Sequence, residues 1–169
     1  KYEENVLFRN KNTPESILEI QHAYKQGGIS YTSNLAVRCM PKMTVKDGKP
    51  YFDGVLIEEI GINAQTGSNA RPNTAYVMQQ ERGSGDIRAE VNMAWGYGGK
   101  DFSGASQYKP YLGPKFWCPN MQSSADGNNY KLYRYADAIL MKAECLYAKS
   151  KYAEAVKYLN MTRVRAGLD

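Results

Sequence analysis

The chain has 169 residues, of which 43% are hydrophobic and 23% are charged, which excludes a disordered tail and allows a packed core. Its 22 Lys and Arg exceed its 17 Asp and Glu, giving a net charge of +5, and 14 Tyr dominate its aromatic residues. Eight of the basic residues fall in residues 130–169, interleaved there with four acidic ones. That distribution favours a solvated helix surface over a nucleic-acid patch, so we expect no nucleic-acid partner.

The residue types that common catalytic and metal sites need are absent or badly spaced. His22 is the one histidine, which excludes an HExxH motif. Cys39, Cys118 and Cys145 form no CxxC pair, so neither a zinc site nor a disulfide framework is encoded, and we expect Cys145 to be buried among its Ala and Leu neighbours. The glycines at 96–99 lack phosphate-loop spacing. We expect no catalytic residues, no metal, no cofactor and no enzymatic activity.

No segment resembles a signal peptide or a transmembrane helix, and the chain begins at Lys1 without an initiator Met. We expect the start to be processed or trimmed, so this absence does not indicate a cytoplasmic location.

In the first third of the chain, the β-branched, roughly alternating run after Pro14 predicts a strand at 16–24, ended by two glycines. Residues 25–53 are typical of an irregular excursion. Asp47 and Gly48 predict a two-residue hairpin turn between strands at 43–45 and 51–52. Residues 61–71 are rich in Gly, Asn, Ser and Thr and predict a loop.

In the middle third, Asn73 or Thr74 is expected to cap a short helix that runs to about Glu81. Apolar residues alternate with polar ones from Asp86 to Met93, which predicts a strand with one buried face. Residues 96–114 predict a loop, 115–117 a second strand with Trp117 in the core, and 119–129 a turn.

The last forty residues predict a helical hairpin. Apolar residues recur at helical spacing from Leu132 to Tyr147 and again from Tyr152, with a turn at 149–151. Arg163 and Arg165 precede Gly167, as suits a helix C-terminus. Small residues allow the two helices to approach closely: Ala136, Ala143, Ala148 and Ala155.

The hairpin has about the length of one tetratricopeptide unit, and such a unit buries its apolar stripe only by stacking on neighbours. Either the strand region covers it or partner helices lie in sequence outside this chain. We favour the second, and therefore expect a piece of a longer protein. The expected organisation is an irregular, loop-rich subdomain at 1–129 and the helical hairpin at 130–169.

Several stretches of the sequence match one set of motifs in order, among them ESILEIQ and YRYADAILMKAE, of which the second is the most specific. They resemble the SusD/RagB family of outer-membrane nutrient-binding lipoproteins, in which the first is similar to a strand and the second to a helix. Ile87 stands where the family's Asp-Pro-Arg motif has Pro. The stretches that carry the resemblance lie at 15–21, 71–77, 85–88, 133–144, 152–160 and 163–167.

This resemblance implies a mainly α-helical protein with tetratricopeptide-like pairs and an irregular α+β subdomain of short strands and long loops. It also implies a lipid-anchored location at the outer membrane and cell surface, with the anchor outside this chain. The implied partners are a glycan ligand, or a peptide as in the RagB branch, and a TonB-dependent SusC-like transporter.

Two groups of residues are candidates for a role. The family's motif residues have structural interpretations: Asp86 and Arg88 flank a strand entry, and Arg134 and Asp137 lie one helical turn apart. Sugars stack their C–H faces on aromatic rings, so loop aromatics are the candidate glycan contacts: Tyr24, Tyr31, Tyr51, Trp95 and Tyr97. The alternative is that each of these rings anchors its loop on the core.

The leading hypothesis is non-catalytic capture of oligosaccharide or polysaccharide and its delivery to the transporter. The alternatives are peptide capture and a protein-interaction scaffold within an outer-membrane transport complex. A hydrolase is a more distant alternative.

Overall fold

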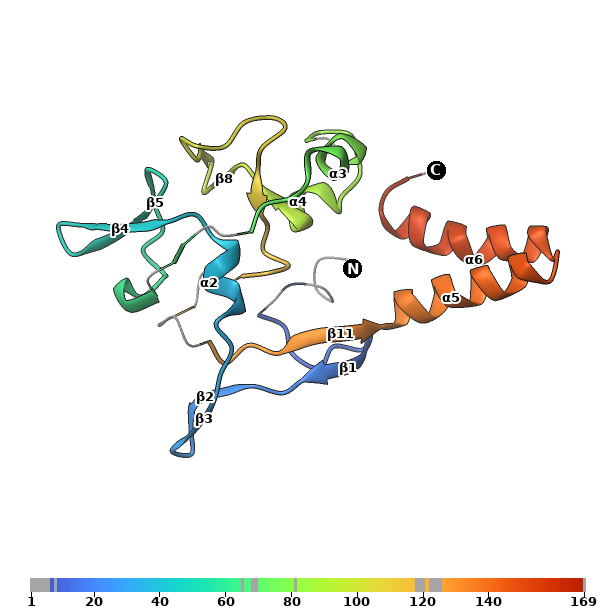
Figure 1. The fold of residues 1–169 in the computed structure, drawn as a ribbon, viewed down its shortest axis with the longest axis horizontal. Coiled ribbons are helices and arrows are strands. Elements are labelled where there is room, and N and C mark those ends of the chain that lie inside the picture. The colour runs from blue at the N-terminus through green and yellow to red at the C-terminus, as the bar shows by residue number, and fades with distance from the viewer. Residues whose placement is uncertain are drawn as a thin grey trace.

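The structure, a computed structural model, describes residues 7, 9–64, 66–67, 70–80, 82–117, 121 and 126–168. In these residues the chain forms a loop-rich body of short strands and short helices, from which a long helical hairpin extends (Figure 1). This combination confirms the predicted fold class. Cys118, Glu81 and most of the turn predicted at 119–129 lie outside the described residues.

The body and the helical hairpin are joined by an antiparallel pair of strands. Strand β1 (Ser16–Ile20) pairs with β11 (Tyr130–Arg134), with Ile20 opposite Tyr130 and Ser16 opposite Arg134. The Tyr135 amide adds one more bond, donating to the Glu15 carbonyl at 2.7 Å. The strand predicted at 16–24 is therefore confirmed in its first part, and a separate strand β2 (Ala23–Gln26) follows it.

Short hairpins make up much of the body. Strands β2 and β3 (Ile29–Tyr31) form one, and β4 (Met43–Lys46), β5 (Lys49–Phe52) and β6 (Val55–Leu56) form a three-stranded sheet. The predicted turn is confirmed, since Asp47 and Gly48 have φ of 51° and 70°, as a type I′ turn requires.

One apolar cluster forms the core beneath the three-stranded sheet. It lies between helix α2 (Leu35–Cys39), the 3₁₀ helix η1 (Ile62–Ala64) and the short pair β7 (Met93–Ala94) and β10 (Tyr111–Leu112). Trp117 is 2% exposed and donates its indole N–H to the Leu112 carbonyl, which confirms its predicted place in the core. The buried members are Ala36, Cys39, Met40, Phe52, Val55, Ile57, Ile60, Ala64, Ala94, Phe102, Tyr111, Trp117 and Met121.

Helix α3 (Thr74–Gln79) begins as predicted. The Asn73 side chain accepts a hydrogen bond from the Ala75 amide at 2.8 Å, which satisfies one of the free donors at the helix start.

The strand predicted from Asp86 to Met93 is wrong. The Asp86 carboxylate accepts a bond from the Arg88 amide, and its carbonyl accepts one from the Ala89 amide, so the chain coils into the short helix α4 (Ala89–Asn92). Ala89, Val91 and Met93 are buried as predicted, whereas Ile87 is 40% exposed and Asn92 is buried, against the prediction. Local side-chain bonding of this kind competes with strand pairing.

The strand predicted at 115–117 is also wrong. Gly113 and Pro114 lead into a turn in which the Phe116 amide donates to the Gly113 carbonyl at 2.9 Å. The Lys115 amide bonds instead to the Val91 carbonyl, so this segment packs against α4 without forming a strand.

The helical hairpin is confirmed, but it begins at residue 135 instead of 130. Residues 130–134 extend because they pair with β1, and helices α5 (Tyr135–Ala148) and α6 (Tyr152–Arg165) follow. Leu132 therefore lies on a strand and is 44% exposed. At the C-terminal end, the amides of Gly167 and Leu168 donate to the carbonyls of Val164 and Arg163, the predicted left-handed cap.

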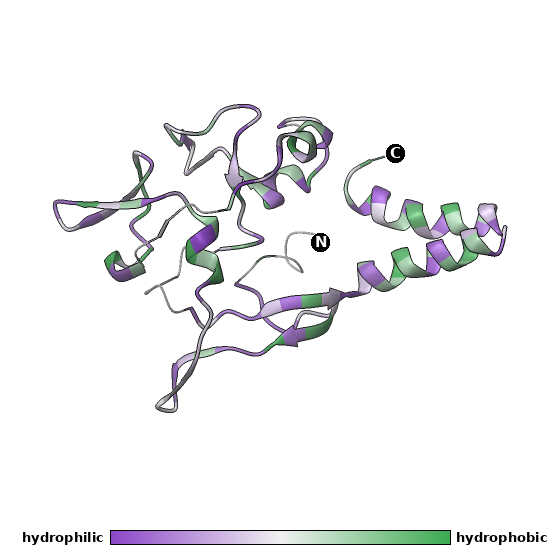
Figure 2. Cartoon of the chain, in the orientation of Figure 1, coloured by the Kyte–Doolittle hydropathy of each residue, from purple (hydrophilic) through white to green (hydrophobic). Residues whose placement is uncertain are grey.

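Small side chains face the partner helix where α5 and α6 pack. Ala136, Ala143 and Ala155 are buried, whereas Ala148 is exposed. Apolar residues on the other faces of both helices remain exposed, as Figure 2 shows in green on this part of the chain. The largest exposed fractions are those of Tyr135, Met141, Tyr147, Tyr152, Val156 and Val164. The loop-rich body therefore does not cover these faces, and a cover by partner helices stays a prediction.

The prediction that Cys145 is buried is wrong, because its thiol lies on an exposed face of α5. Burial raises the pKa of the Cys39 thiol to about 11.

In the part of the chain described here, no helix is long and apolar enough to cross a membrane.

The tight packing of α5 on α6 predicts different outcomes at two alanines of α6. Ala155→Leu is expected to destabilise the chain by about 1–3 kcal/mol, because a larger side chain has no room at the buried interface. Ala153 is exposed, so Ala153→Leu is expected to change stability by less than about 0.5 kcal/mol. Urea denaturation of both variants measures the difference. Equal midpoints would show that the helices are not closely packed at this position.

Candidate ligand-binding site

A small hairpin carries one of the predicted aromatic residues into a hollowed part of the body. Strands β8 (Gly96–Tyr97) and β9 (Lys100–Asp101) are joined by Gly98 and Gly99, with φ of 57° and 78°. A Cβ at position 96 would lie 2.1 Å from the Lys100 carbonyl oxygen, so only Gly allows the strands to approach this closely. The two glycines between Tyr97 and Lys100 are themselves a hairpin signal that the predicted loop at 96–114 overlooked.

Two hollows lie next to this hairpin. One, of about 320 Å³, runs along β7–β9 and is bordered by Arg82, Glu90 and Trp117. A second, of about 450 Å³, lies between the hairpin and residues Glu58 and Glu59. Tyr97 and Lys100 line both hollows, so a ligand long enough to extend from one hollow into the other would contact these two side chains.

Tyr97 is half-buried and held from two directions. Its ring lies 6.5 Å from that of Trp117, tilted by 50°, and its hydroxyl donates to Glu59 Oε1 at 3.3 Å. Burial and then the nearby Glu59 carboxylate raise the pKa of the Tyr97 hydroxyl. The hydroxyl therefore remains a donor at neutral pH, beside a carboxylate acceptor. This is a combination that a sugar hydroxyl can bond to.

Trp95 does not face solvent, so the expectation that its ring is free to stack is wrong. It is 4% exposed and packs with Val77, Ala89 and Met93. Its indole N–H donates to the Gln107 carbonyl at 3.2 Å. Because Trp95 is fixed in this way, only part of its surface lines the hollow along β7–β9 and a further one, of about 310 Å³, next to Gln107.

Charged side chains that the sequence pattern did not single out surround the hairpin. Arg82 pairs with Asp101 at 3.2 Å, and its guanidinium lies 5.5 Å from the Trp95 ring. Lys49 pairs with Glu58 at 2.7 Å. These pairs are exposed and contribute little to stability, so their members are available to hydrogen-bond a ligand. The described residues hold no group of three or more His, Cys, Asp or Glu side chains that suits a metal ion.

The other three predicted aromatic residues lie on other hairpins. Tyr24 and Tyr31 are on β2 and β3, exposed by 36% and 69%, and Tyr51 is half-buried on β5. Figure 1 shows β2 and β3 at the lower corner of the body, away from β8. Tyr51 lies nearer, since it pairs with Leu56, which lines the hollow beside Tyr97, but Tyr51 itself does not line that hollow. The structure therefore does not bring the five aromatic residues into one site.

The four motif residues form local ion pairs near the foot of the helical hairpin. Arg88 grips the Asp86 carboxylate with two nitrogens, at 2.9 and 2.7 Å, and this hydrogen bonding lowers the pKa of Asp86 although burial opposes it. The Asp137 carboxylate accepts from the Arg134 amide at 2.8 Å and so caps α5.

A buried acid joins three segments at this junction. Glu15 is 7% exposed, and its carboxylate pairs with Arg134 of β11 and with Arg165 of α6. Next to it, the Ile87 amide donates to the Ala166 carbonyl at 3.0 Å. The sequence pattern assigned no role to Glu15, whose partners lie more than one hundred positions away along the chain.

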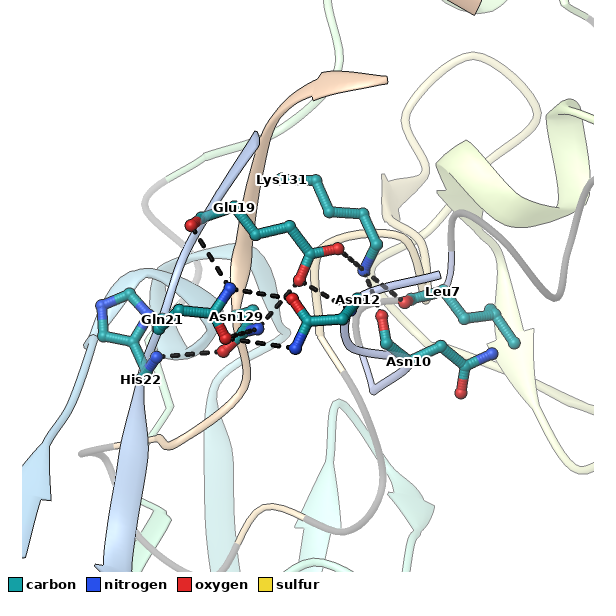
Figure 3. Close-up of polar contacts among 8 residues, drawn as sticks. All are labelled: Leu7, Asn10, Asn12, Glu19, Gln21, His22, Asn129 and Lys131. Atoms are coloured by element: carbon teal, nitrogen blue, oxygen red, sulfur yellow. Dashed lines mark hydrogen bonds and ion pairs between the residues drawn. The ribbon is translucent and has the colours of Figure 1, made fainter. Parts of the chain in front are cut away.

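A second buried network ties β1 to β11, as Figure 3 shows. Asn129 donates to Glu19 and Gln21 at 2.8 Å each and accepts from the His22 amide at 3.0 Å. Lys131 lies 3.9 Å from the Glu19 carboxylate. Burial raises the pKa of Glu19, but the hydrogen bonds it accepts outweigh that effect and the pKa is lowered. We interpret this network as structural, because its polar groups bond to one another.

The fold agrees with the comparisons to known proteins. The SusD family model matches residues 18–169, so the chain belongs to the SusD family. No curated protein matches it in sequence.

Solved structures show the same fold. Surface glycan-binding protein A from Bacteroides uniformis matches with a TM-score of 0.62 and 21% identity over 94% of this chain and 31% of its own. A SusD superfamily protein from Bacteroides fragilis matches with 0.64 and 18% over 98% of this chain and 34% of its own. One from Parabacteroides distasonis matches with 0.55 and 21%, over 99% and 34%. The chain thus spans about a third of each.

The junction predicts a large effect for a small change at Glu15. Glu15→Gln is expected to destabilise the chain by about 2–3 kcal/mol, because two partly buried guanidinium groups lose their counter-charge. Glu144→Gln, on an exposed face of α5, is the matched control and is expected to cost less than about 0.5 kcal/mol. Chemical denaturation followed by circular dichroism compares the two. A Glu15 variant as stable as its control would show that the ion pairs at this junction do not stabilise the fold.

The Arg88–Asp86 pair predicts a change in acid sensitivity. Since the folded state lowers the pKa of Asp86, this group stabilises the fold above its unfolded pKa, and the contribution is lost as pH falls through the folded pKa. Arg88→Met is expected to raise the pKa of Asp86 and to move acid unfolding to higher pH. Carboxyl NMR titration measures the pKa. Arg82→Met, which breaks an exposed pair, is expected to leave the acid midpoint unchanged.

Proposed function

We propose that this protein binds oligosaccharide or polysaccharide at the bacterial cell surface without cleaving it, and delivers it to a TonB-dependent SusC-like transporter. Membership of the SusD family supports this role, since its members are in general surface-exposed outer-membrane proteins. A similar solved structure is named a surface glycan-binding protein. A lipid anchor outside this chain would hold the protein at the outer membrane.

The β8–β9 hairpin is the place where we propose the glycan binds. The observation that carries this choice is Tyr97, which lines two hollows and whose hydroxyl, while donating to Glu59, can still accept a hydrogen bond from a ligand. A partly exposed ring offers the apolar surface on which a sugar's C–H face packs, and adjoining polar groups set its orientation. Tyr24, Tyr31 and Tyr51 would then contact ligand only as separate, secondary surfaces.

Affinity electrophoresis in gels that contain single polysaccharides tests the function and its site together. The full chain is expected to be retarded by at least one polysaccharide, and Tyr97→Ala is expected to weaken that retardation about tenfold or more, as loss of an aromatic anchor does. Tyr147→Ala removes an equally large exposed ring from α5 and is expected to change nothing. Release of reducing sugar is expected to be undetectable.

Other outcomes would redirect or end the proposal. If Tyr31→Ala abolished retardation and Tyr97→Ala did not, the site would lie on the β2–β3 hairpin. Retardation by no polysaccharide, together with binding of a peptide pool, would replace glycan capture by peptide capture. Binding of neither, with co-purification of a transporter that survives loss of Tyr97, would support a scaffold role.

A further inference from the structure

A hollow of about 260 Å³ lies at the foot of the helical hairpin, apart from the β8–β9 surface. Its polar lining is mainly cationic, with Lys115, Lys131 and Arg134 against the single acid Asp137, and its apolar walls include Phe116 and Leu35. It is roomier than a bare inorganic ion needs, since one water occupies about 30 Å³ in the liquid. Its size and walls suit a small organic molecule that carries a negative group.

Two of the three cations are already engaged. Lys131 lies 3.9 Å from the Glu19 carboxylate and donates to the carbonyl oxygens of Leu7 and Asn10 at 3.1 and 2.5 Å. Arg134 pairs with Glu15 at 3.4 Å and lies 4.0 Å from Asp137. The arginines closest behind the hollow also have acids: Arg88 grips Asp86, and Arg165 shares Glu15.

Lys115 is the exception. In the described part of the chain its ammonium makes no hydrogen bond and no ion pair, and it lies 5.6 Å from the centre of the Phe116 ring. Burial, together with the positive charges of Arg134 and Arg88, lowers the pKa of Lys115 to about 8, although Asp137 and Glu15 oppose the shift. A half-buried cation without a partner loses part of its hydration, and an anion placed beside it in the hollow would offset that cost.

We propose that this hollow binds the carboxylate of an acidic sugar, with Lys115 as its counter-charge and Phe116 and Leu35 against the sugar ring. A uronic acid combines the two features that the hollow offers, a carboxylate for the ammonium and apolar C–H groups for the walls. The choice of a sugar acid rests on the proposed function. The anion preference rests on the hollow alone, and the site is separate from Tyr97.

Isothermal titration with galacturonate, and with galactose as its uncharged analogue, tests the proposal on the full chain. At pH 7 galacturonate is expected to bind at least tenfold more tightly than galactose. Lys115→Gln is expected to weaken galacturonate at least tenfold, whereas Lys157→Gln, an exposed lysine on α6, is expected to leave it unchanged. Raising the pH from 7 to 9.5 discharges Lys115 while the neighbouring arginines stay charged, and is expected to weaken binding similarly. Burial also lowers the pKa of Lys131 in the same lining, so the pH series is repeated on Lys115→Gln, in which the remaining pH dependence belongs to Lys131.

Several results would overturn the proposal. Equal binding of galactose, or no effect of Lys115→Gln, would show that the hollow does not recognise the negative charge of the ligand. Sulfate or phosphate that competed as well as galacturonate would indicate an adventitious ion only, and a short acidic peptide that competed better would assign the hollow to peptide. Should the variant fold poorly, galacturonate-induced NMR shifts at Lys115 and Phe116 of the unmodified protein give the same answer, their absence counting against it.

The two sites can fail independently. Lys115→Gln is expected to leave the retardation by a neutral polysaccharide intact, and Tyr97→Ala is expected to leave galacturonate binding intact. Loss of galacturonate binding in the Tyr97 variant would show that the hollow is not a separate site.

Discussion

The carboxylate of Glu15 is the interaction on which the arrangement of the two parts depends. It is buried at the end of β1, where a lone negative charge would be strongly unfavourable, and it is compensated by guanidinium groups from β11 and α6. Those two elements reach it only if β1 pairs with β11 in register and if α6 folds back along α5. The charge of Glu15 therefore couples the β1–β11 pair to the helical hairpin, because its two ion pairs form together only when both are in place.

Several of the stretches that resemble the family lie at this junction. The first contains Glu15 and Glu19, another places Asp86 and Arg88 beside the end of α6, and the helical stretches supply Arg134 and Arg165. The stretch at 71–77 lies elsewhere, since Arg71 donates to the carbonyls of Gly104 and Lys109. The junction residues hold the scaffold together, and the β8–β9 hairpin contributes to none of their contacts.

Features set by neighbouring residues were predictable, and features set by distant ones were not. The Asp47–Gly48 turn, the Asn73 cap and the α5–α6 hairpin each follow from a few adjacent side chains, and all three are confirmed. The β1–β11 pair joins segments more than one hundred positions apart, so its extension to residues 130–134 was invisible to a helical pattern. At the candidate site, the choice of Tyr97 as a ligand contact stays a prediction, whereas Trp95 is buried, because a Gly-rich neighbourhood does not reveal which ring turns inward.

The separation of scaffold from ligand-facing hairpins has an energetic basis. Two-residue turns such as Gly98–Gly99 fix the register of β8 and β9 through backbone conformation, so the side chains near the tip contribute little to that register. The exposed Lys100 can thus change with little cost to the core, whereas Tyr97 also packs against the core beside Trp117. Glu15, Glu19 and Asn129 cannot change without cost, because each is buried among partners that would be left unpaired. Lys115 is half-buried against the scaffold and makes no ion pair there in the described residues. The acidic ligand proposed for the hollow at the foot of the hairpin would supply that missing counter-charge.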